Sequence, residues 1–274
     1  MGAAAASVIV RCKNEARTLG ATLDALERQT VRPEIVFIDS GSTDGSRELA
    51  RGRADRMLDI APGSFTYGSA LNLGAGTASA PIHFACSAHC VPRDDWVERS
   101  LAHYERDDVA GTNGIQTFAD GSPVNEVFYQ DAAHARSNPD WGFSNHASSW
   151  RASVWERFPF DERLDYAEDR EWSWRVTGAG YVIAFDPALW VGLSHSWQGI
   201  RNVYQRRRRA ARAVRAFAPV PAYTARDALA EWWRNTPADG HSRAFHRLNP
   251  GRMAGLAGKW SGHRGAVEGA WIDR

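Results

Sequence analysis

Residues 34–46 read Glu34-Ile35-Val36-Phe37-Ile38-Asp39-Ser40-Gly41-Ser42-Thr43-Asp44-Gly45-Ser46, an apolar run that ends in an acid and a polar turn. A short apolar run bounded by such a turn is typical of a buried strand. In α/β folds, ligands bind at the carboxyl ends of parallel strands. Asp39 is therefore a candidate partner for a nucleobase or ribose. The alternative is that the turn only caps the helix expected to begin near Glu48.

The same alternation of strands and helices extends on both sides of this segment. We expect strands over 7–11, 34–39, 57–59, 82–86, 181–185 and 189–193, and helices over 15–29, 44–53, 68–78 and 200–217. This β-α-β order predicts an α/β fold with a Rossmann-like nucleotide-binding half. We therefore divide the chain into a nucleotide-sugar-binding half (1–90), an acceptor-binding half of the same domain (91–199) and a mostly helical region (200–274).

Glu168 and Asp169 form an adjacent acidic pair among the aromatic and arginine residues of segment 159–175. Neighbouring residues on a helix point in different directions, so one acid can face a pocket while the other faces the scaffold. A solvated helix face with partners four residues away is the ordinary alternative for such a pair. Its position downstream of the Asp39 turn favours the functional interpretation.

Several motifs, taken in order, resemble the family 2 glycosyltransferases of GT-A fold, especially rhamnosyltransferase-like members. The likeness covers about residues 7–195. It rests on an opening strand with an Asn-Glu turn (7–16), an Asp-x-Gly-Ser-x-Asp nucleotide motif (39–46), an Ala-Arg-Asn-x-Gly-like segment with Leu71 in place of Arg (65–74), an acceptor-side turn (143–151) and the Glu168-Asp169 pair. The resemblance implies a mixed sheet that joins the nucleotide-binding half to an acceptor-binding half.

The resemblance also implies a function and a set of site residues. The implied reaction is inverting transfer of a sugar from a nucleotide-diphosphate donor to a small-molecule, glycan or lipid-linked acceptor hydroxyl, with Asp169 as general base beside Glu168. Residues expected to contact the nucleotide sugar are Arg11, Glu15, Asp39, Asn72, Ser87 and His89. Residues expected to contact the acceptor or the sugar are Asn145, His146, Trp141 and Trp174.

The expected metal motif departs from the family pattern. The family carries Asp-x-Asp at the place where this chain has Ser87-Ala88-His89. Mg²⁺ prefers oxygen ligands, whereas a neutral imidazole can also bind Mn²⁺. His89 and His195 are thus candidate ligands for a divalent cation (Mn²⁺ or Mg²⁺). Equally, His89 could bond a phosphate directly while His195 packs against Trp197. A zinc site at His83, Cys86, His89 and Cys90 is disfavoured because the spacing lacks a paired Cys-x2-Cys knuckle.

Composition narrows the class of protein. The 274 residues carry a formal net charge of +1, which gives no case for nucleic acid as a partner. The apolar runs are short compared with the ~20 residues that span a bilayer, no secretory signal is recognised, and three cysteines favour a reducing compartment. We therefore expect a cytoplasmic protein. The arginine run 206–209 is either a solvated helix face or a contact to a membrane surface or diphosphate.

Two other classes of function remain open from the sequence. A sugar-nucleotide nucleotidyltransferase would share the Rossmann-like half, but residues 11–20 lack a glycine-rich phosphate loop with a basic residue. A non-catalytic nucleotide-sugar-binding protein on the same fold is compatible with the missing Asp-x-Asp motif.

Overall fold

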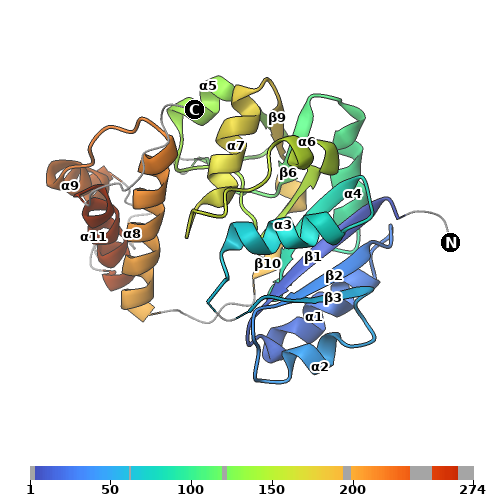
Figure 1. The fold of residues 1–274 in the computed structure, drawn as a ribbon. Helices are drawn as coiled ribbons and strands as arrows, with labels where there is room; N and C mark the ends of the chain where they lie inside the picture. Colours follow the sequence, from blue (N-terminus) through green and yellow to red (C-terminus); the bar gives the residue numbers. More distant parts are fainter. Residues whose placement is uncertain (1–3, 62, 119–121, 194–198, 235–248, 265–274) are drawn as a thin grey trace. The chain divides into compact units, whose positions relative to one another are not determined.

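The computed structural model describes residues 4–61, 63–118, 122–193, 199–234 and 249–264. The chain divides into two compact units (Figure 1). The first unit comprises residues 1–164 and 168–194, and the second comprises residues 165–167 and 195–274. In the described ranges, the strands belong to the first unit and the second contains helices.

An eight-stranded sheet runs through the first unit in the order β3-β2-β1-β4-β8-β6-β9-β7, and β10 pairs separately with β5. The strands are β1 (Ala6–Cys12), β2 (Glu34–Asp39), β3 (Arg56–Asp59), β4 (Ile82–Ser87), β5 (Cys90–Val91), β6 (Val109–Asn113), β7 (Phe128–Gln130), β8 (Ala147–Arg151), β9 (Val182–Phe185) and β10 (Gly192–Leu193). Strands β3, β2, β1 and β4 are parallel, whereas β8 is antiparallel to both β4 and β6. The predicted α/β fold with a mixed sheet is therefore confirmed.

Helices cover both faces of the sheet in the first unit. The helices of this unit are α1 (Ala16–Glu27), α2 (Ser46–Ala50), α3 (Tyr67–Thr77), α4 (Trp96–Ala102), the 3₁₀ turn η1 (His103–Glu105), α5 (Ala132–Ser137), α6 (Ala152–Arg157), α7 (Glu168–Gly178) and the 3₁₀ turn η2 (Pro187–Leu189). One core contains buried residues of α1 and α4, and the other contains buried residues of α3, α6 and α7. The sheet thus forms the middle layer of three.

Local hydrogen bonds explain where two of these helices begin. The Thr66 side chain accepts from the Ser69 amide at 3.0 Å and Ser69 Oγ accepts from the Thr66 amide at 2.9 Å, which is a reciprocal capping box at the start of α3. The Asp44 carboxylate accepts from the amide of Ala16 at 2.9 Å, so the turn after β2 caps α1. Both helices therefore start at the edge of the sheet where β1 and β2 end.

Two predicted elements differ from those observed. The helix expected over 44–53 is shorter, Ser46–Ala50, because Gly45 precedes it with a φ of 92° and Asp44 bonds the Ser46 amide from outside the helix. The strand predicted over 189–193 begins too early in the chain, so its predicted start is wrong. Asp186 caps the 3₁₀ turn η2, which ends at Leu189, and only Gly192–Leu193 pairs as a strand.

The second unit contains α8 (Gly199–Phe217), α9 (Ala225–Arg234) and α11 (Pro250–Arg264). Helices α8 and α11 pack closely. A Cβ atom added at Gly258 would lie only 2.3 Å from the Tyr204 carbonyl oxygen. The four arginines 206–209 on α8 are exposed, as are Leu229 and Trp233 on α9. In the described ranges, none of the helices has both the length and the apolar character needed to cross a membrane.

Candidate active site

Arg11 connects the end of β1 to the loop before β8. Its Nη2 donates to the carbonyl oxygen of Asn145 at 2.7 Å, to Oδ1 of Asn145 at 2.9 Å and to Oγ of Ser87 at 3.3 Å. The guanidinium also lies 5.5 Å from the ring centroid of Tyr67, which is a cation–π distance. Nε and Nη1 of Arg11 are buried without a hydrogen-bond partner among the described residues. Arg11 therefore has donors to spare at the carboxyl edge of the sheet.

The acidic pair lies at the amino terminus of α7 and contacts the same asparagine. The Asn145 amide donates to Oδ2 of Asp169 at 3.0 Å, and the Asn145 side-chain Nδ2 donates to Oε1 of Glu168. The Arg170 amide donates to Oδ1 of Asp169 at 2.8 Å. A helix amino terminus favours negative charge, so this position suits a carboxylate. Arg11, Asn145, Glu168 and Asp169, which are distant in sequence, thus form one connected cluster.

Glu168 and Asp169 differ in their surroundings. Glu168 is 1% exposed and Asp169 is 9% exposed. Burial and, to a smaller extent, the nearby negative charge of Asp169 raise the pKa of Glu168 to about 8, against the opposing effect of the Arg11 charge. Glu168 is consequently protonated at neutral pH, and the pair as a whole carries less than two negative charges.

The side chains of Asp39 and Asn14 stabilise the turn after β2. Both carboxylate oxygens of Asp39 accept from the Ser42 amide, at 3.2 and 3.0 Å, and Asp39 is 4% exposed. Oδ1 of Asn14, a residue with a φ of 56°, accepts from the Thr43 amide at 2.8 Å. The two neighbouring strand-end turns are therefore cross-linked to one another, which places Asp39 and the segment after β1 at one edge of the sheet.

Glu15, Ser87 and His89 gather beside this edge. Nδ1 of His89 lies 3.1 Å from Oε1 of Glu15, and Oε2 of Glu15 accepts from the Thr18 hydroxyl at 3.1 Å. The Ala88 amide donates to the carbonyl of Arg11 at 3.2 Å, which fixes the Ser87-Ala88-His89 segment against β1. The structure thus brings together five of the six residues expected at the nucleotide sugar, namely Arg11, Glu15, Asp39, Ser87 and His89.

The sixth residue, Asn72, is engaged elsewhere. Its Nδ2 donates to the Phe160 carbonyl at 2.9 Å and to Glu162 at 2.8 Å. Its Oδ1 accepts from the Trp155 indole at 2.9 Å and from the Phe160 amide at 3.0 Å. These four bonds tie α3 to the segment around Phe160, so the side chain of Asn72 has a structural role in this conformation.

The residues expected on the acceptor side also do not all lie together. His146 follows Asn145, and its Nδ1 lies 2.5 Å from the Ser144 hydroxyl. Trp174 is on α7 and is partly buried. Trp141 donates to the Thr117 carbonyl at 2.9 Å and packs among Phe118, Phe128, His134 and Phe185, with centroid distances of 4.7–6.3 Å. His146 and Trp174 therefore neighbour the acidic cluster in sequence, whereas Trp141 belongs to a separate aromatic cluster.

Similar known proteins identify the family of this chain. The sequence profile of Glycosyl transferase family 2 matches residues 7–162, which is more than half of the chain. The chain belongs to this family. It is 28% identical over 193 residues to glycosyltransferase AglE of Haloferax volcanii, covering 65% of this chain and 63% of that protein. It is also 28% identical over 207 residues to the O-antigen chain rhamnosyltransferase WbaN of Salmonella anatum, covering 66% and 63%. The chain thus spans a little under two thirds of the length of these curated relatives.

A solved structure supports the fold of this family 2 member. The mannosyltransferase PcManGT from Pyrobaculum calidifontis, solved with GDP-Man and Mn²⁺, superposes with a TM-score of 0.60 at 17% identity. The match covers 92% of this chain and 73% of that one. The expected resemblance to family 2 glycosyltransferases and the GT-A fold are therefore both confirmed.

The described residues of this family 2 chain do not offer a set of ligands that suits a divalent cation. Within the part of the chain that the structure describes, no three His, Cys, Asp or Glu side chains are grouped closely enough to hold a metal ion. His89 and Glu15 offer one imidazole and one carboxylate, and these are already engaged with each other. The other predicted ligand, His195, lies outside the described residues. The described donor set does not by itself form a Mg²⁺ or Mn²⁺ site.

Two residues near the cluster were missed from the sequence. Nδ2 of Asn113, at the end of β6, donates to the carbonyls of Ser144 at 3.2 Å and Ala147 at 2.7 Å, so it shapes the loop that presents Asn145. Tyr67 supplies the ring beside Arg11. An asparagine that ends a strand is the only signal the sequence offers for the first. Nothing in the sequence marks Tyr67 as a partner of Arg11.

Proposed function

We propose that this family 2 chain catalyses inverting transfer of a sugar from a nucleotide-diphosphate donor to an acceptor hydroxyl. The carrying observation is the cluster in which Asn145 bonds Arg11, Glu168 and Asp169. It joins a cation at the carboxyl end of β1 to the acidic pair at the start of α7. A reaction between an anionic donor and a neutral hydroxyl needs both features, a cation for the diphosphate and a base for the hydroxyl.

The proposed step is a single displacement. The acceptor oxygen attacks the anomeric carbon while the bond from that carbon to the diphosphate oxygen breaks, and the acceptor proton passes to Asp169. Asp169 is the better candidate base because it is the more exposed of the two acids, at 9% against 1%. The raised pKa of Glu168 keeps that side chain protonated at neutral pH, so it does not compete for the proton.

The donor contacts form the second part of the proposal. Residues 1–90 bind the nucleotide sugar, with Asp39 at the nucleobase or ribose and Glu15, Ser87 and His89 around it, while Asn72 acts indirectly by holding α3 in place. Nε and Nη1 of Arg11 are cationic donors with no partner among the described residues, which suits the departing diphosphate. Since Ser87 and His89 supply no carboxylate for a hard cation, we expect a weak cation requirement and assign the neutralisation of charge mainly to Arg11.

The acceptor side is assigned to residues 91–199, where Asn145 and His146 orient the reacting sugar or acceptor, and Trp174 forms a wall. Sugars pack their C–H faces on aromatic rings. A lipid-linked acceptor would place the reaction at a membrane surface, whereas a small molecule or a free glycan would not.

Side chains on α8 and α9 support contact with a membrane surface. Arg206–Arg209 on α8 are exposed, and on α9 the side chains of Leu229 and Trp233 are 64% and 60% exposed. Arginines attract anionic lipid, and exposed leucine and tryptophan insert into the interface. Sedimentation with anionic and with neutral vesicles tests this. We expect binding to the anionic vesicles only, weakened by replacing Arg206–Arg209 with glutamine. Equal recovery with both kinds of vesicle contradicts the proposal.

The decisive experiment is turnover of a panel of nucleotide-diphosphate sugars with candidate acceptors. Release of nucleoside diphosphate, and a product of inverted anomeric configuration by NMR, support the proposal. Release of pyrophosphate from a nucleoside triphosphate plus a sugar phosphate identifies a nucleotidyltransferase instead. Binding of nucleoside diphosphates without turnover of any donor identifies a binding protein on the same fold.

A further inference from the structure

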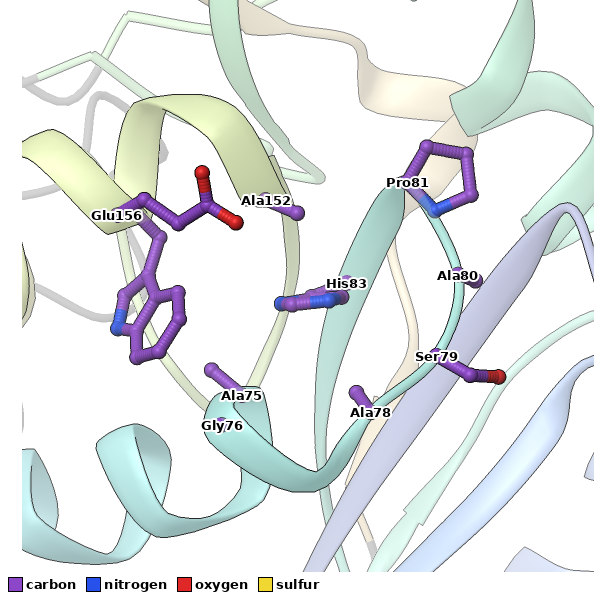
Figure 2. A pocket seen from close by; sticks show the side chains of 10 residues that line it. Ala75, Gly76, Ala78, Ser79, Ala80, Pro81, His83, Ala152 and Glu156 are labelled. Carbon is purple, nitrogen blue, oxygen red and sulfur yellow. The ribbon is translucent and has the colours of Figure 1, made fainter.

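A pocket of about 400 Å³ opens at the amino end of β4, away from the cluster described above. Figure 2 shows it between the end of α3, the segment that leads into β4, and α6. His83 is near the start of β4, whereas Ser87 at the candidate active site is the last residue of that strand. Four residues of strand separate them by about 13 Å. The pocket is therefore a separate site within the first unit.

His83 gives the pocket a buried polar group that is not fully bonded. Its side chain extends from β4 into the pocket (Figure 2), yet the residue is only 2% exposed, and Nδ1 has no hydrogen-bond partner among the described residues. Burial lowers the pKa of His83 to about 4, so the imidazole is neutral near pH 7. A neutral imidazole has one donor and one acceptor nitrogen. Buried polar atoms are normally hydrogen-bonded, so this one is an unusual feature of the wall.

The remaining walls combine negative charge with apolar surface. Glu156 on α6 lines the pocket with an exposed carboxylate and has no ion-pair partner in the described ranges. Ala75 and Gly76 belong to the last turn of α3, where the carbonyl groups of a helix carry partial negative charge. No arginine or lysine is among the described residues that line the pocket.

An aromatic ring completes the pocket. Trp155 lines it, and the Trp155 indole is fixed by its hydrogen bond of 2.9 Å to Asn72. Its ring centroid lies 6.1 Å from that of His83. An indole face attracts cations more strongly than the other aromatic rings do. A carboxylate, helix carbonyls, an indole and a neutral imidazole together favour an organic cation over an anion or an uncharged sugar.

We propose that this pocket binds a small organic ammonium ion with an apolar body. The ammonium group lies between the Glu156 carboxylate and the His83 imidazole, and the apolar body packs on Trp155 and the surrounding alanines. The site is independent of the sugar-transfer reaction proposed above, and its occupant does not contact Arg11 or Asp169.

The test is an NMR titration of the full chain with benzylammonium and with its uncharged isostere, benzyl alcohol. We expect benzylammonium to bind and the alcohol to bind at least about fivefold more weakly, which is the gain of one partly exposed ion pair. Glu156→Gln should raise the Kd for benzylammonium by a similar factor. Glu105→Gln, which neutralises another exposed carboxylate in η1, should leave it unchanged.

Each other outcome overturns the site. Equal affinity for the amine and the alcohol, or no binding of either, removes the case for cation recognition. An unchanged Kd in Glu156→Gln shows that the amine binds elsewhere. Displacement of benzylammonium by a nucleoside diphosphate would place it in the candidate active site. Because Glu156 is exposed, its variant is expected to fold normally, and His83→Phe serves as a second variant that removes the imidazole nitrogens.

Discussion

Nη2 of Arg11 donates hydrogen bonds to both oxygen atoms of Asn145, at 2.7 Å to the carbonyl and 2.9 Å to Oδ1. The two residues are 134 positions apart in the chain. Asn145 passes the connection on to Glu168 through its side-chain amide and to Asp169 through its backbone amide. The position of the candidate base is therefore set by a residue at the carboxyl end of the first strand.

The first prediction concerns the base. Asp169→Asn should retain the fold and the affinity for nucleoside diphosphate but lose transfer activity by about 10²–10⁴-fold, because an amide cannot take the acceptor proton. Initial rates and calorimetric titration of the same preparation measure the two effects. Asp107→Asn is the matched control, since that carboxylate is exposed in the loop before β6. Near-normal turnover in Asp169→Asn would transfer the role to Glu168.

The second prediction separates two roles of Asp39. Asp39→Asn keeps a side-chain oxygen to accept from the Ser42 amide, so the turn should survive while the negative charge is lost. If Asp39 also binds the nucleobase or the ribose, the nucleoside diphosphate affinity should fall by about 1.5–3 kcal/mol, as for a lost hydrogen bond to a charged group. Calorimetry measures this. Unchanged affinity with an unchanged melting temperature would mean that Asp39 only caps its turn.

The third prediction uses the pKa of Glu168. Folded Glu168 holds its proton up to about pH 8, whereas the unfolded chain releases it near the ordinary value of 4.5. Between those values the folded state binds more protons, so this group makes stability fall as the pH rises. Glu168→Gln has no proton to lose and should be spared that fall. The resulting difference is on the order of a few kcal/mol above pH 8.

Urea unfolding of wild type and Glu168→Gln at pH 5, 7 and 9 measures this difference. The free energy of unfolding of the variant, relative to that of the wild type, should increase as the pH rises. Two parallel profiles would show that Glu168 is ionised in the folded protein at neutral pH. Glu105→Gln, an exposed carboxylate in η1, is the control that should run parallel to wild type.

The fourth prediction concerns the cation. Activity should persist after exhaustive chelation. Any stimulation by Mn²⁺ should exceed that by Mg²⁺, because the site offers the imidazole of His89 in place of a second carboxylate. The Mn²⁺ effect should be smaller in His89→Ala, which removes the imidazole. Complete loss on chelation, full recovery with Mg²⁺ and no effect of His89→Ala would contradict this.

The fifth prediction tests the close packing of α3 on the sheet. A Cβ at Gly74 would lie 2.5 Å from Cγ2 of Ile9, so Gly74→Ala should destabilise the protein by about 1–3 kcal/mol through overpacking. Gly20 in α1 has open space around its Cβ position. Gly20→Ala should therefore stabilise by about 0.5–1 kcal/mol through helix propensity. Urea unfolding measures both, and equal effects of the two substitutions would rule out the packing argument.

The parallel half of the sheet could be predicted because its strands are continuous apolar runs, as at Ile35–Ile38. Strand β8 could not be predicted in that way. Its Ser149 is buried in the middle of the sheet, where its hydroxyl lies 2.7 Å from those of Ser100, Thr112 and Tyr104. A strand that contains serines does not show the apolar pattern of a core strand, and its partners are supplied by tertiary contacts.

The candidate site shows the same division. The residue types of Asp39, Glu168 and Asp169 are visible in local motifs, so they could be named from the sequence. Their partners could not be named, because Asn145 reaches Arg11 and Glu168 across long stretches of chain. The engagement of Asn72 with Phe160, Trp155 and Glu162 depends on the folded position of α3 and was likewise inaccessible.

The insertion of β8 between β4 and β6 has a consequence for the order of folding. Strands β1 to β4 can pair with one another as the chain grows, since all four lie within the first 90 residues. Strand β6 pairs only with β8 and β9, both of which come later. Such long-range pairing is slow. We expect amide hydrogen exchange during refolding to protect β1 and β2 early and β6 late, so that Asn145 is presented to Arg11 among the last native contacts to form.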